Sequence, residues 1–444
     1  MAMNLDKKYV VTPEEIRRLC TCGKPHPSAD VMHFSGPMAL QALAEDARLA
    51  GRSILLIDDE NTHQAAGSRV EELFREQAVP HQVLTFAGRI SATEERVDEV
   101  IDQSRAHEII VSVGAGTIND LGKFAATKRD IPFWTVPTAP SMNGYTSAIA
   151  AIKIAGVKRT IPAKPPQFIY NDPEIICRAP LDLRQAGYCD VMAKSVSDID
   201  WQIESMLFSD SYCSLPASIV VQGESGFRDV PEKIRQGEPD AILALQNGLL
   251  ASGISMLLAG SSAPASGGEH LFSHFLDMRE PITGRTPKLH GLQVAAGIIL
   301  SAACYEKLAS LDKADLKPMG QTAYDRDLKT IRPTWGDTAA EVEKRFDLKR
   351  PQLLQLNQLL PANWDKIQPL CAQVHGPQYY LDLFRRTGFS MTLDSLDLTK
   401  DEFLLAAISA RTIRERLTVL DLAAQLGVLE QTAHQVAGLL QAEA

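Results

Sequence analysis

The sequence predicts an α/β domain built on a parallel sheet, followed by an all-helical domain. In the first part of the chain, short apolar runs alternate with helical patterns, which is typical of a parallel sheet with connecting helices. After about residue 178 the strand pattern stops, and long Ala- and Leu-rich stretches replace it. Because 444 residues are too many for one hydrophobic core, we expect an α/β domain at 1–178 and an all-α domain at 179–444.

The elements of the first domain follow from apolar runs and their spacing. Strands are predicted over 53–57, 81–86, 108–113, 132–136 and 167–170. Helices are predicted between them over 62–76, 93–106 and 118–127, the second with Thr93 as its N-cap. Gly, Asp, Thr or Asn lies within two residues after each strand. Because ligands bind at the carboxyl ends of strands in such sheets, these residues indicate a binding crevice.

Long apolar stretches predict the helices of the second domain. They lie over 182–207, 241–260, 268–279, 290–311, 338–347, 351–360, 377–387, 400–412 and 417–443.

Composition and charge narrow the class of protein. Apolar residues make up 45% and charged residues 23% of the chain, as in ordinary globular enzymes. A net charge of −10 argues against nucleic-acid binding. The seven cysteines are scattered and the N-terminus has no signal-peptide pattern, so we expect a reduced, cytoplasmic setting. We expect no apolar run to reach the length of a membrane span, since Ser and Gly interrupt the stretch from Leu249 to Ala259.

An early cluster, Cys20, Cys22 and His26, resembles part of a metal site. Structural zinc sites prefer two or more residues between neighbouring cysteines, and here there is one. The pattern therefore favours a surface turn shaped by Gly23 and Pro25.

A glycine turn lies between a predicted strand and a predicted helix. It consists of Gly114, Ala115, Gly116 and Thr117, and Asn119 and Asp120 follow it. Glycine lets phosphate oxygens approach backbone amides at a helix start, so the turn predicts a site for the pyrophosphate of a nicotinamide dinucleotide. The turn is not a complete G-x-G-x-x-G fingerprint, and an ordinary bend after a strand is the alternative.

Asp58 and Asp59 end the first predicted strand. A carboxylate there can accept hydrogen bonds from a ribose diol and disfavours a 2′-phosphate. The alternative is a solvated strand end.

The segment 137–147, PTAPSMNGYTS, follows the fourth predicted strand. It is long and rich in hydroxyl groups, including Ser141 and Ser147, with Asn143 between them. We expect it to line the crevice beside the nicotinamide; the alternative is a simple connecting loop.

One carboxylate, Asp190, and three imidazoles, His270, His274 and His290, are candidate metal ligands. A catalytic divalent metal needs about three protein ligands and one open position. Asp190 precedes Lys194 by one helical turn, and the alternative for this pair is an exposed ion pair. For His270 and His274, also one turn apart, the alternative is a buried structural pair.

Several segments, taken in order, resemble the iron-containing alcohol dehydrogenase superfamily, which includes the dehydroquinate synthases. They are VGAGTINDLGK at 113–123, PTAPSMNGYTS at 137–147, GVKRTIPAKPP at 156–166, AGYCDVMAKSVSDIDW at 186–201, SGGEHLFSHFLDM at 266–278, HGLQVAAG at 290–297 and ERLTVLDLAAQLGVL at 415–429. Within the superfamily, the chain is most similar to the sn-glycerol-1-phosphate dehydrogenases of the bacterial type.

The resemblance implies a Rossmann-like nucleotide domain, an all-α domain and an active site in the cleft, as in the dehydroquinate synthase-like fold. It implies metal ligands at Asp190, His270 and His290. It also implies cofactor contacts at Gly114 to Thr117, Asp120, Thr138, Ser141 and Ser147. Two residues depart from the family pattern: Asn143 stands where Asp is usual near the substrate hydroxyls, and Leu292 where Glu is common.

The function that the resemblance implies is interconversion of dihydroxyacetone phosphate and sn-glycerol 1-phosphate, a step of phospholipid metabolism, with NAD(P)H and one divalent metal. Zinc is the first choice, and nickel and iron accept the same ligands. His274 would relay a proton, and Lys194 or Lys158 would meet the phosphate. The expected state is a homo-oligomer, a dimer or larger, with no nucleic-acid or membrane partner.

Three alternatives remain open. A glycerol dehydrogenase-like reductase would act on unphosphorylated ketones or polyols. A dehydroquinate synthase-like lyase would use NAD without net consumption. A non-catalytic descendant of the family would bind no metal.

Overall fold

The computed structural model describes residues 6–9, 12–27, 29–154, 157–209, 211–224 and 226–441. Contacts divide the chain into two compact units, Met1–Val191 with Cys213–Ser262, and Met192–Tyr212 with Ala263–Ala444. The segment 213–262 therefore belongs to the first unit, although the sequence predicts that the second domain begins at residue 179. The functional domains at 1–178 and 179–444 stay a prediction.

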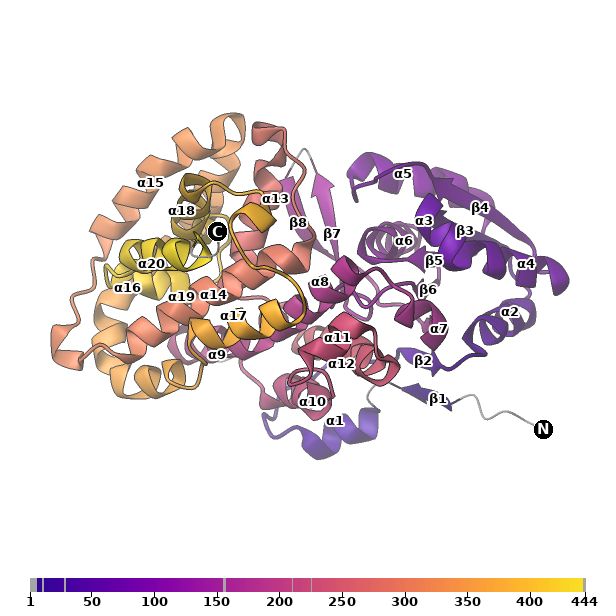
Figure 1. Ribbon diagram of the computed structural model, residues 1–444, viewed down its shortest axis with the longest axis horizontal. Helices are drawn as coiled ribbons and strands as arrows, with labels where there is room; N and C mark the ends of the chain where they lie inside the picture. The colour runs from indigo at the N-terminus through magenta and orange to yellow at the C-terminus, as the bar shows by residue number, and fades with distance from the viewer. Residues whose placement is uncertain are drawn as a thin grey trace. The chain divides into compact units, whose positions relative to one another are not determined.

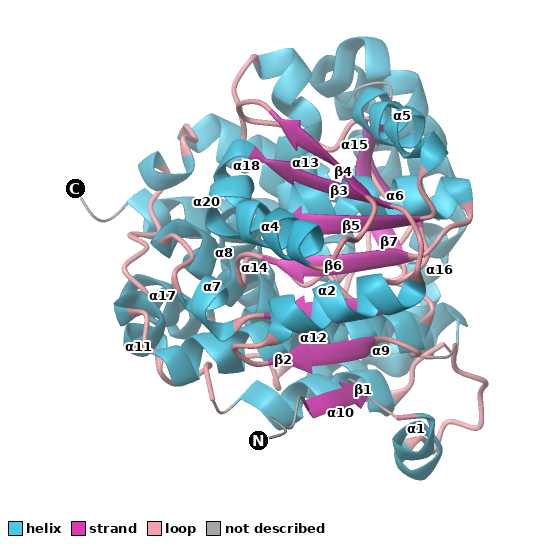
Figure 2. Ribbon diagram, turned by 90° about the vertical axis from the view of Figure 1, so that its right-hand side faces the viewer, coloured by secondary structure: helices cyan, strands magenta, loops and turns pink. Residues whose placement is uncertain are grey.

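The first unit contains a seven-stranded sheet in the order β1-β2-β9-β6-β5-β3-β4. Its strands are β1 (Asp6–Tyr9), β2 (Met32–Ser35), β3 (Ile54–Asp59), β4 (His81–Phe86), β5 (Ile109–Gly114), β6 (Phe133–Pro137) and β9 (Phe168–Asn171). All neighbours pair in parallel except β1 and β2, which are antiparallel. The predicted parallel sheet is confirmed, and Figure 2 shows its strands side by side.

Alternate residues of the central strands enter two separate cores, one on each face of the sheet. On β3, Ile54 and Leu56 pack with α2 and α4, whereas Leu55 and Ile57 pack with α5 and α6. In Figure 2, α2 and α4 cover the face of the sheet that is turned toward the viewer. Strands buried on both faces need continuous apolar runs, which is why they stand out as runs in the sequence.

The first unit also contains helices, among which α2, α4, α5 and α6 pack on the sheet. The helices of this unit are α1 (Pro13–Leu19), α2 (Ala39–Ala50), α3 (Glu60–Thr62), α4 (Ser68–Glu76), α5 (Glu94–Gln103), α6 (Gly116–Arg129), α7 (Pro173–Cys177), α8 (Leu181–Met192), α10 (Ser214–Glu224), α11 (Pro231–Gln236) and α12 (Pro239–Ala259). Thr93 is the N-cap of α5, as predicted, since its side chain accepts the N–H of Arg96.

The sequence did not predict β1, β2 or the antiparallel hairpin of β7 (Ile149–Ile154) and β8 (Val157–Pro162). This hairpin forms a second sheet of its own (Figure 1). Basic residues interrupt its apolar pattern, and the residues of β7 are only alternately buried, so it lacks the continuous run by which the other strands were found.

The described residues of the second unit form helices joined by turns and loops, and none of them lies in a strand. Its helices are α9 (Lys194–Glu204), α13 (Gly268–Thr283), α14 (His290–Ala309), α15 (Gln321–Trp335), α16 (Ala339–Cys371), α17 (Pro377–Arg386), α18 (Lys400–Ser409), α19 (Val419–Gln425) and α20 (Leu429–Gln441). The two short helices predicted over 338–347 and 351–360 form one helix, α16, which continues through Pro351 and Pro361. The predicted fold class, α/β followed by all-α, is confirmed.

Two helices are long and apolar enough to cross a membrane, which corrects the expectation that no such run exists. They are α12 and α14, and 78% and 83% of their most apolar windows are buried inside the protein. Both are core helices in this structure. The Ser and Gly residues within α12 do not lower its mean hydropathy below that of a helix that could cross a membrane.

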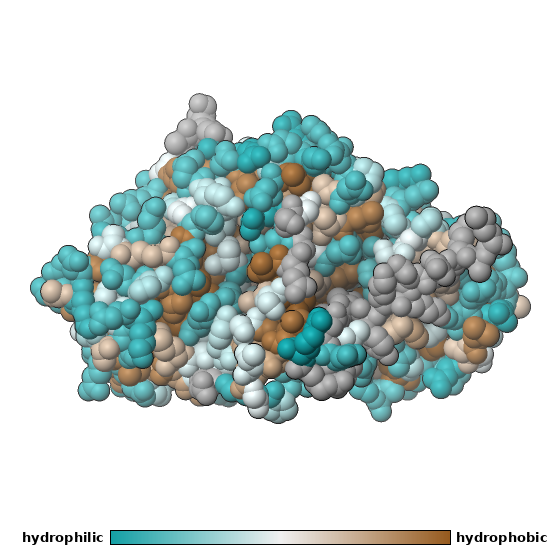
Figure 3. Space-filling view, turned by 90° about the horizontal axis from the view of Figure 1, so that it is seen from below, coloured by the Kyte–Doolittle hydropathy of each residue, from teal (hydrophilic) through white to brown (hydrophobic). Residues whose placement is uncertain are grey.

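Hydrophilic residues cover most of the face drawn in Figure 3, and hydrophobic residues lie among them. The large hydrophobic side chains exposed on the described surface are scattered along the chain, as in Leu49, Val221 and Leu348. Single exposed apolar residues are normal on protein surfaces.

Candidate functional site

The glycine turn leads directly from β5 into α6. Gly114 ends the strand and Gly116 begins the helix. A β-carbon at Gly114 would lie 2.6 Å from Cβ of Ile118, and one at Gly116 would lie 3.1 Å from Cγ of Met142. No described side chain caps the first turn of α6. Its N–H groups are therefore presented without a side-chain acceptor, which suits an anion.

Asp120, in the second turn of α6, is held by the β7–β8 hairpin. Its Oδ2 accepts the N–H of Ala151 at 3.1 Å. Burial raises the pKa of Asp120, while the charge of Lys123 opposes that shift. These contacts join α6 to β7; a contact of Asp120 with a cofactor stays a prediction.

Lys123 is a buried cation that the sequence did not single out. It has no exposed surface, and its Nζ donates to the carbonyl oxygens of Gly144 at 2.5 Å and Ile149 at 3.2 Å. Burial lowers the pKa of Lys123 to about 8, against the opposing charge of Asp120. A lysine within the otherwise apolar stretch LGKFAA was the available signal. It ties α6 to the loop that follows β6.

The two carboxylates at the end of β3 have different surroundings. Asp58 is fully buried, its Oδ2 lies 2.8 Å from Nδ1 of His63, and burial raises its pKa. Asp59 is partly exposed and caps α3, because its Oδ1 accepts the N–H groups of Asn61 and Thr62. Of the two, only Asp59 has a solvent-accessible side chain for the predicted ribose contact.

The loop after β6 holds the predicted nicotinamide-side residues in a compact turn. The N–H of Thr138 donates to the carbonyl oxygen of Gly114 at 3.3 Å. The Ser147 hydroxyl donates to the carbonyl oxygen of Gly144 at 2.9 Å. Thr138, Ser141 and Ser147 are all buried. The loop is thus attached to the glycine turn, and its contact with a nicotinamide stays a prediction.

Glycines let two helices approach this loop closely. A β-carbon at Gly187 of α8 would lie 1.7 Å from the carbonyl oxygen of Pro140, and one at Gly253 of α12 would lie 2.0 Å from Oγ1 of Thr146. Any larger side chain at Gly187 would push α8 away from the loop. Gly187 lies one turn before Asp190 on the same helix.

Asn143, the residue that departs from the family pattern, contacts Asp190 directly. Its backbone N–H donates to Oδ2 of Asp190 at 2.8 Å, and its Nδ2 donates to Oδ1 at 3.3 Å. Asp190 has no exposed surface and Asn143 is buried. Asn143 therefore orients a carboxylate that was predicted to bind metal, rather than only facing a substrate hydroxyl.

In the second unit, His270, His274 and His290 form a cluster of rings. Ring centroids lie 5.1 Å apart for His270 and His290, 6.0 Å for His270 and His274, and 5.6 Å for His274 and His290. The first two residues lie one turn apart on α13, and His290 is the first residue of α14. The structure thus brings together all three predicted imidazoles.

The hydrogen bonds of two of these imidazoles select the same tautomer. Nδ1 of His270 lies 2.9 Å from Oε1 of Glu269, a carboxylate that accepts. Nδ1 of His290 lies 2.8 Å from Oγ of Ser273, whose own hydrogen goes to Oε1 of Gln293 at 2.9 Å. Both rings therefore carry hydrogen on Nδ1 and the lone pair on Nε2, the arrangement that metal-ligating histidines use.

His274 has the opposite tautomer. Its Nδ1 lies 3.1 Å from Nη2 of Arg414. Burial lowers the pKa of Arg414 only to about 10, so the guanidinium stays charged at neutral pH and can only donate. Nδ1 of His274 must accept, and its hydrogen is on Nε2. In this tautomer Nε2 can donate a hydrogen bond but has no lone pair for a metal.

The start of α13 explains the glycines of the SGGEH segment. Oδ2 of Asp200 accepts the N–H of Gly268 at 2.8 Å, and Oε1 of Glu269 accepts the N–H of Gly267 at 2.6 Å. A β-carbon at Gly267 would lie 2.3 Å from Oδ2 of Asp200. Burial raises the pKa of Asp200 to about 7, and the nearby Glu269 adds to the shift. Asp200 thus positions the segment that carries His270.

The two candidate phosphate residues differ in burial. Lys194 begins α9 and is buried, so the alternative of an exposed ion pair with Asp190 is wrong. A break at Ala193 separates α8 from α9, so the two residues do not share one continuous helix. Lys158 is partly exposed on β8.

The sequence did not predict the residues that form hydrogen bonds with the imidazoles. Glu269 is adjacent to His270 in the sequence, whereas Ser273 lies 17 residues from His290 and donates in turn to Gln293. Their polar character in apolar helices was the available signal. Arg414 lies 140 residues from His274 in the sequence, and no local pattern indicates it.

Comparison with known proteins shows the family of the chain. A model of the iron-containing alcohol dehydrogenase family matches residues 37–180. The glycerol-1-phosphate dehydrogenase (NAD(P)+) of Bacillus licheniformis is 33% identical over 316 residues, covering 69% of this chain and 79% of that protein. The enzyme of the same name from Bacillus subtilis is 35% identical over 270 residues, covering 60% and 68%. The chain belongs to the iron-containing alcohol dehydrogenase family.

Solved structures agree on the fold. The crystal structure of a probable glycerol dehydrogenase from Sinorhizobium meliloti 1021 matches with a TM-score of 0.58 at 15% identity, over 93% of this chain and 99% of that chain. The predicted resemblance to the family is confirmed by these comparisons.

Proposed function

We propose that this protein is a metal-dependent oxidoreductase that uses NAD(P)H to interconvert dihydroxyacetone phosphate and sn-glycerol 1-phosphate. The observation that carries the proposal is the division of three clustered imidazoles into two tautomers. His270 and His290 carry their lone pairs on Nε2, and His274 carries a hydrogen there. The names of the relatives from two Bacillus species support the substrate.

The donor set fits one divalent metal. Asp190, His270 and His290 each offer one ligand atom, and two imidazoles with one carboxylate suit zinc, nickel or iron. When bound, the metal polarises the carbonyl oxygen of the substrate and stabilises negative charge on it. Asn143 orients Asp190, while Glu269 and Ser273 orient the imidazoles.

The remaining roles are assigned to residues of the chain. The uncapped start of α6, at Gly114, Ala115, Gly116 and Thr117, binds the pyrophosphate, with Asp120 nearby. Asp59 accepts hydrogen bonds from the ribose hydroxyls of the cofactor. Thr138, Ser141 and Ser147 line the part of the site that holds the nicotinamide.

We assign to His274 the relay of a proton from solvent to the substrate oxygen during reduction, with its Nε2–H as the hydrogen-bond donor to that oxygen. Lys194 holds the substrate phosphate, with Lys158 as the alternative. The protein acts in the cytoplasm, in phospholipid metabolism, as a homo-oligomer, and zinc is its first-choice metal.

A substrate panel tests the proposal. Purified protein with metal added back is assayed with NADH or NADPH against dihydroxyacetone phosphate, dihydroxyacetone and a simple ketone. Oxidation of the cofactor in proportion to product, with dihydroxyacetone phosphate preferred at least about tenfold, is expected. Equal rates with dihydroxyacetone would support a glycerol dehydrogenase-like activity instead. Turnover of a phosphosugar without net loss of NADH would support the lyase.

A further inference from the structure

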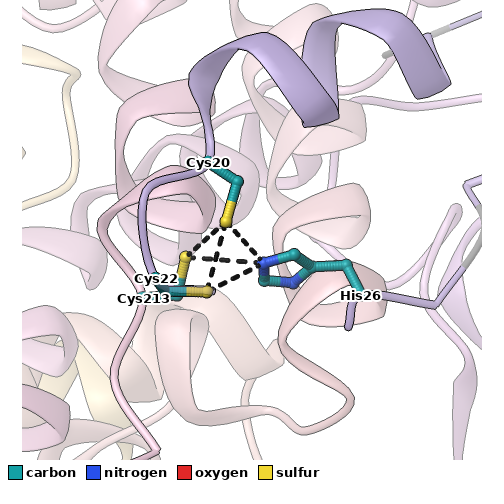
Figure 4. Close-up of side chains that lie close together, drawn as sticks. All are labelled: Cys20, Cys22, His26 and Cys213. Atoms are coloured by element: carbon teal, nitrogen blue, oxygen red, sulfur yellow. Dashed lines mark hydrogen bonds between the residues drawn. The ribbon is translucent and has the colours of Figure 1, made fainter. Parts of the chain in front are cut away.

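Two segments far apart in the sequence meet at a second cluster of metal-ligating side chains (Figure 4). Cys20 directly follows α1, Cys22 and His26 lie in the loop after it, and Cys213 directly precedes α10. All four residues belong to the first compact unit. In Figure 1, α1 lies next to α10.

The four donor atoms are spaced as around one ion. Sγ of Cys20 lies 3.2 Å from Sγ of Cys22, 3.8 Å from Sγ of Cys213 and 3.0 Å from Nε2 of His26. Nε2 of His26 lies 3.3 Å from Sγ of Cys22 and 3.6 Å from Sγ of Cys213. Tetrahedral zinc, with Zn–S of about 2.3 Å and Zn–N of about 2.0–2.1 Å, requires edges of roughly 3.5–3.8 Å. Most of the observed distances are somewhat shorter than these edges.

A disulfide does not account for the cluster. The Sγ atoms of Cys20 and Cys22 are 3.2 Å apart, whereas a disulfide bond is about 2.05 Å long. All three cysteines are free thiols in the structure. Three sulfur atoms and one imidazole nitrogen converge on one point, which is the donor set of a structural zinc site.

Hydrogen bonds orient the ligands from outside. Nδ1 of His26 lies 2.8 Å from the carbonyl oxygen of Leu258, near the end of α12. A carbonyl only accepts, so the hydrogen is on Nδ1 and the lone pair of Nε2 points at the sulfur atoms. The backbone N–H of Lys24 donates to Sγ of Cys22 at 3.3 Å. Such outer contacts are the usual support of metal ligands.

We propose that Cys20, Cys22, His26 and Cys213 bind one structural zinc ion. Four protein ligands close the coordination sphere and leave no position for substrate or water. The ion would join the loop after α1 to the start of α10 and, through His26, to α12. The proposal does not depend on the proposed function, because the ligands of the two metals have no residue in common.

Metal content is the first test. The full chain, purified without chelator, is expected to hold one zinc beyond the metal of Asp190, His270 and His290. Cys213→Ser should lose one equivalent of zinc by elemental analysis and keep the other metal. Cys177→Ser is the matched control, because Cys177 is a free cysteine of the same unit outside the cluster. Unchanged zinc content in Cys213→Ser would overturn the proposal.

Cobalt substitution of the wild-type chain is the second test, and it does not require a variant that folds. Protein produced with cobalt should show thiolate-to-cobalt charge-transfer absorption with tetrahedral d–d bands. A thiol-blocking mercurial should abolish these bands and release one equivalent of metal. A spectrum without thiolate-to-cobalt absorption, or a Cys20–Cys22 disulfide found by mass spectrometry in protein purified under reducing conditions, would refute the site.

Discussion

Asn143 holds Asp190 through two hydrogen bonds, one from its backbone and one from its side chain. The side-chain bond exists only because residue 143 is an amide. A carboxylate at this position would face a second buried carboxylate, and like charges at this distance repel. The departure from the family pattern therefore lies next to a predicted metal ligand, and it changes how that ligand is oriented and charged.

Substitution of Asn143 should change metal affinity in a graded way. Asn143→Ala keeps the backbone bond to Asp190 but loses the side-chain bond, so we expect metal binding to weaken by about tenfold. Asn143→Asp places two carboxylates together, which destabilises the metal-free protein. The metal-induced rise in Tm should therefore be larger for Asn143→Asp than for the unmodified protein. Calorimetric metal binding and Tm with and without metal are the measurements. Identical affinities in all three proteins would show that Asp190 does not bind the metal.

His274 should be separable from the metal ligands. His270→Ala and His290→Ala are expected to lose the catalytic metal and to abolish turnover. His274→Gln should keep the metal, because Nε2 of His274 carries hydrogen and has no lone pair for a metal. It should lower kcat by roughly a hundredfold, because the relay to the substrate oxygen is lost. Metal content and steady-state kinetics distinguish the cases. Loss of metal in His274→Gln, with the fold intact by circular dichroism, would contradict the assignment.

Asp59 should set the preference for NADH over NADPH. A carboxylate facing a 2′-phosphate costs roughly 1 kcal/mol in an exposed site, or about fivefold in the ratio of kcat/KM values. Asp59→Ser should remove this preference while keeping α3 intact, since Ser also caps helices. Asp58→Asn is the control, because Asp58 is fully buried and should not reach the ribose. A preference for NADPH in the unmodified enzyme would mean that neither carboxylate faces the ribose.

Lys194 should make the enzyme prefer the phosphorylated ketone over the unphosphorylated one. A charge-assisted bond contributes about 1.5–3 kcal/mol, so Lys194→Met should lower kcat/KM for dihydroxyacetone phosphate by roughly ten- to a hundredfold. The rate with dihydroxyacetone should change little. Lys158→Met, on the partly exposed β8, is the parallel variant. If Lys158→Met alone shows the loss, the phosphate is held by the hairpin instead.

Lys123 should make stability rise with pH in alkaline solution. Its pKa is about 8 in the folded protein, against 10.5 for an unperturbed lysine, so between these values the unfolded chain binds more protons. The free energy of unfolding therefore increases across this pH range, by about 3 kcal/mol in total. Lys123→Met lacks this dependence. Denaturant midpoints of both proteins, measured from about pH 7 to about pH 10, should diverge only above the folded-state pKa; parallel curves would show that Lys123 stays charged.

Much of the α/β unit could be predicted from the sequence because its strands are locally encoded. The strands β3, β4, β5, β6 and β9 coincide with the predicted runs within one or two residues. The hairpin of β7 and β8 could not be found in this way, because its strands are only partly buried and pair with each other outside the main sheet. Helix continuity was also misjudged here, because the helices predicted over 338–347 and 351–360 are parts of one helix, α16.

By itself, the sequence determined the fold class, five strands of the main sheet, the family and the residue types available for chemistry. Periodicity, glycine turns and ordered motifs are properties of neighbouring residues, and a single chain displays them directly. The tertiary structure alone decided which ring nitrogen of each histidine carries the hydrogen, because Arg414 reaches His274 from 140 residues away. It also decided that Cys213 joins Cys20, Cys22 and His26. Cys213 is 187 residues from His26 in the sequence, and only folding of the unit brings the two together.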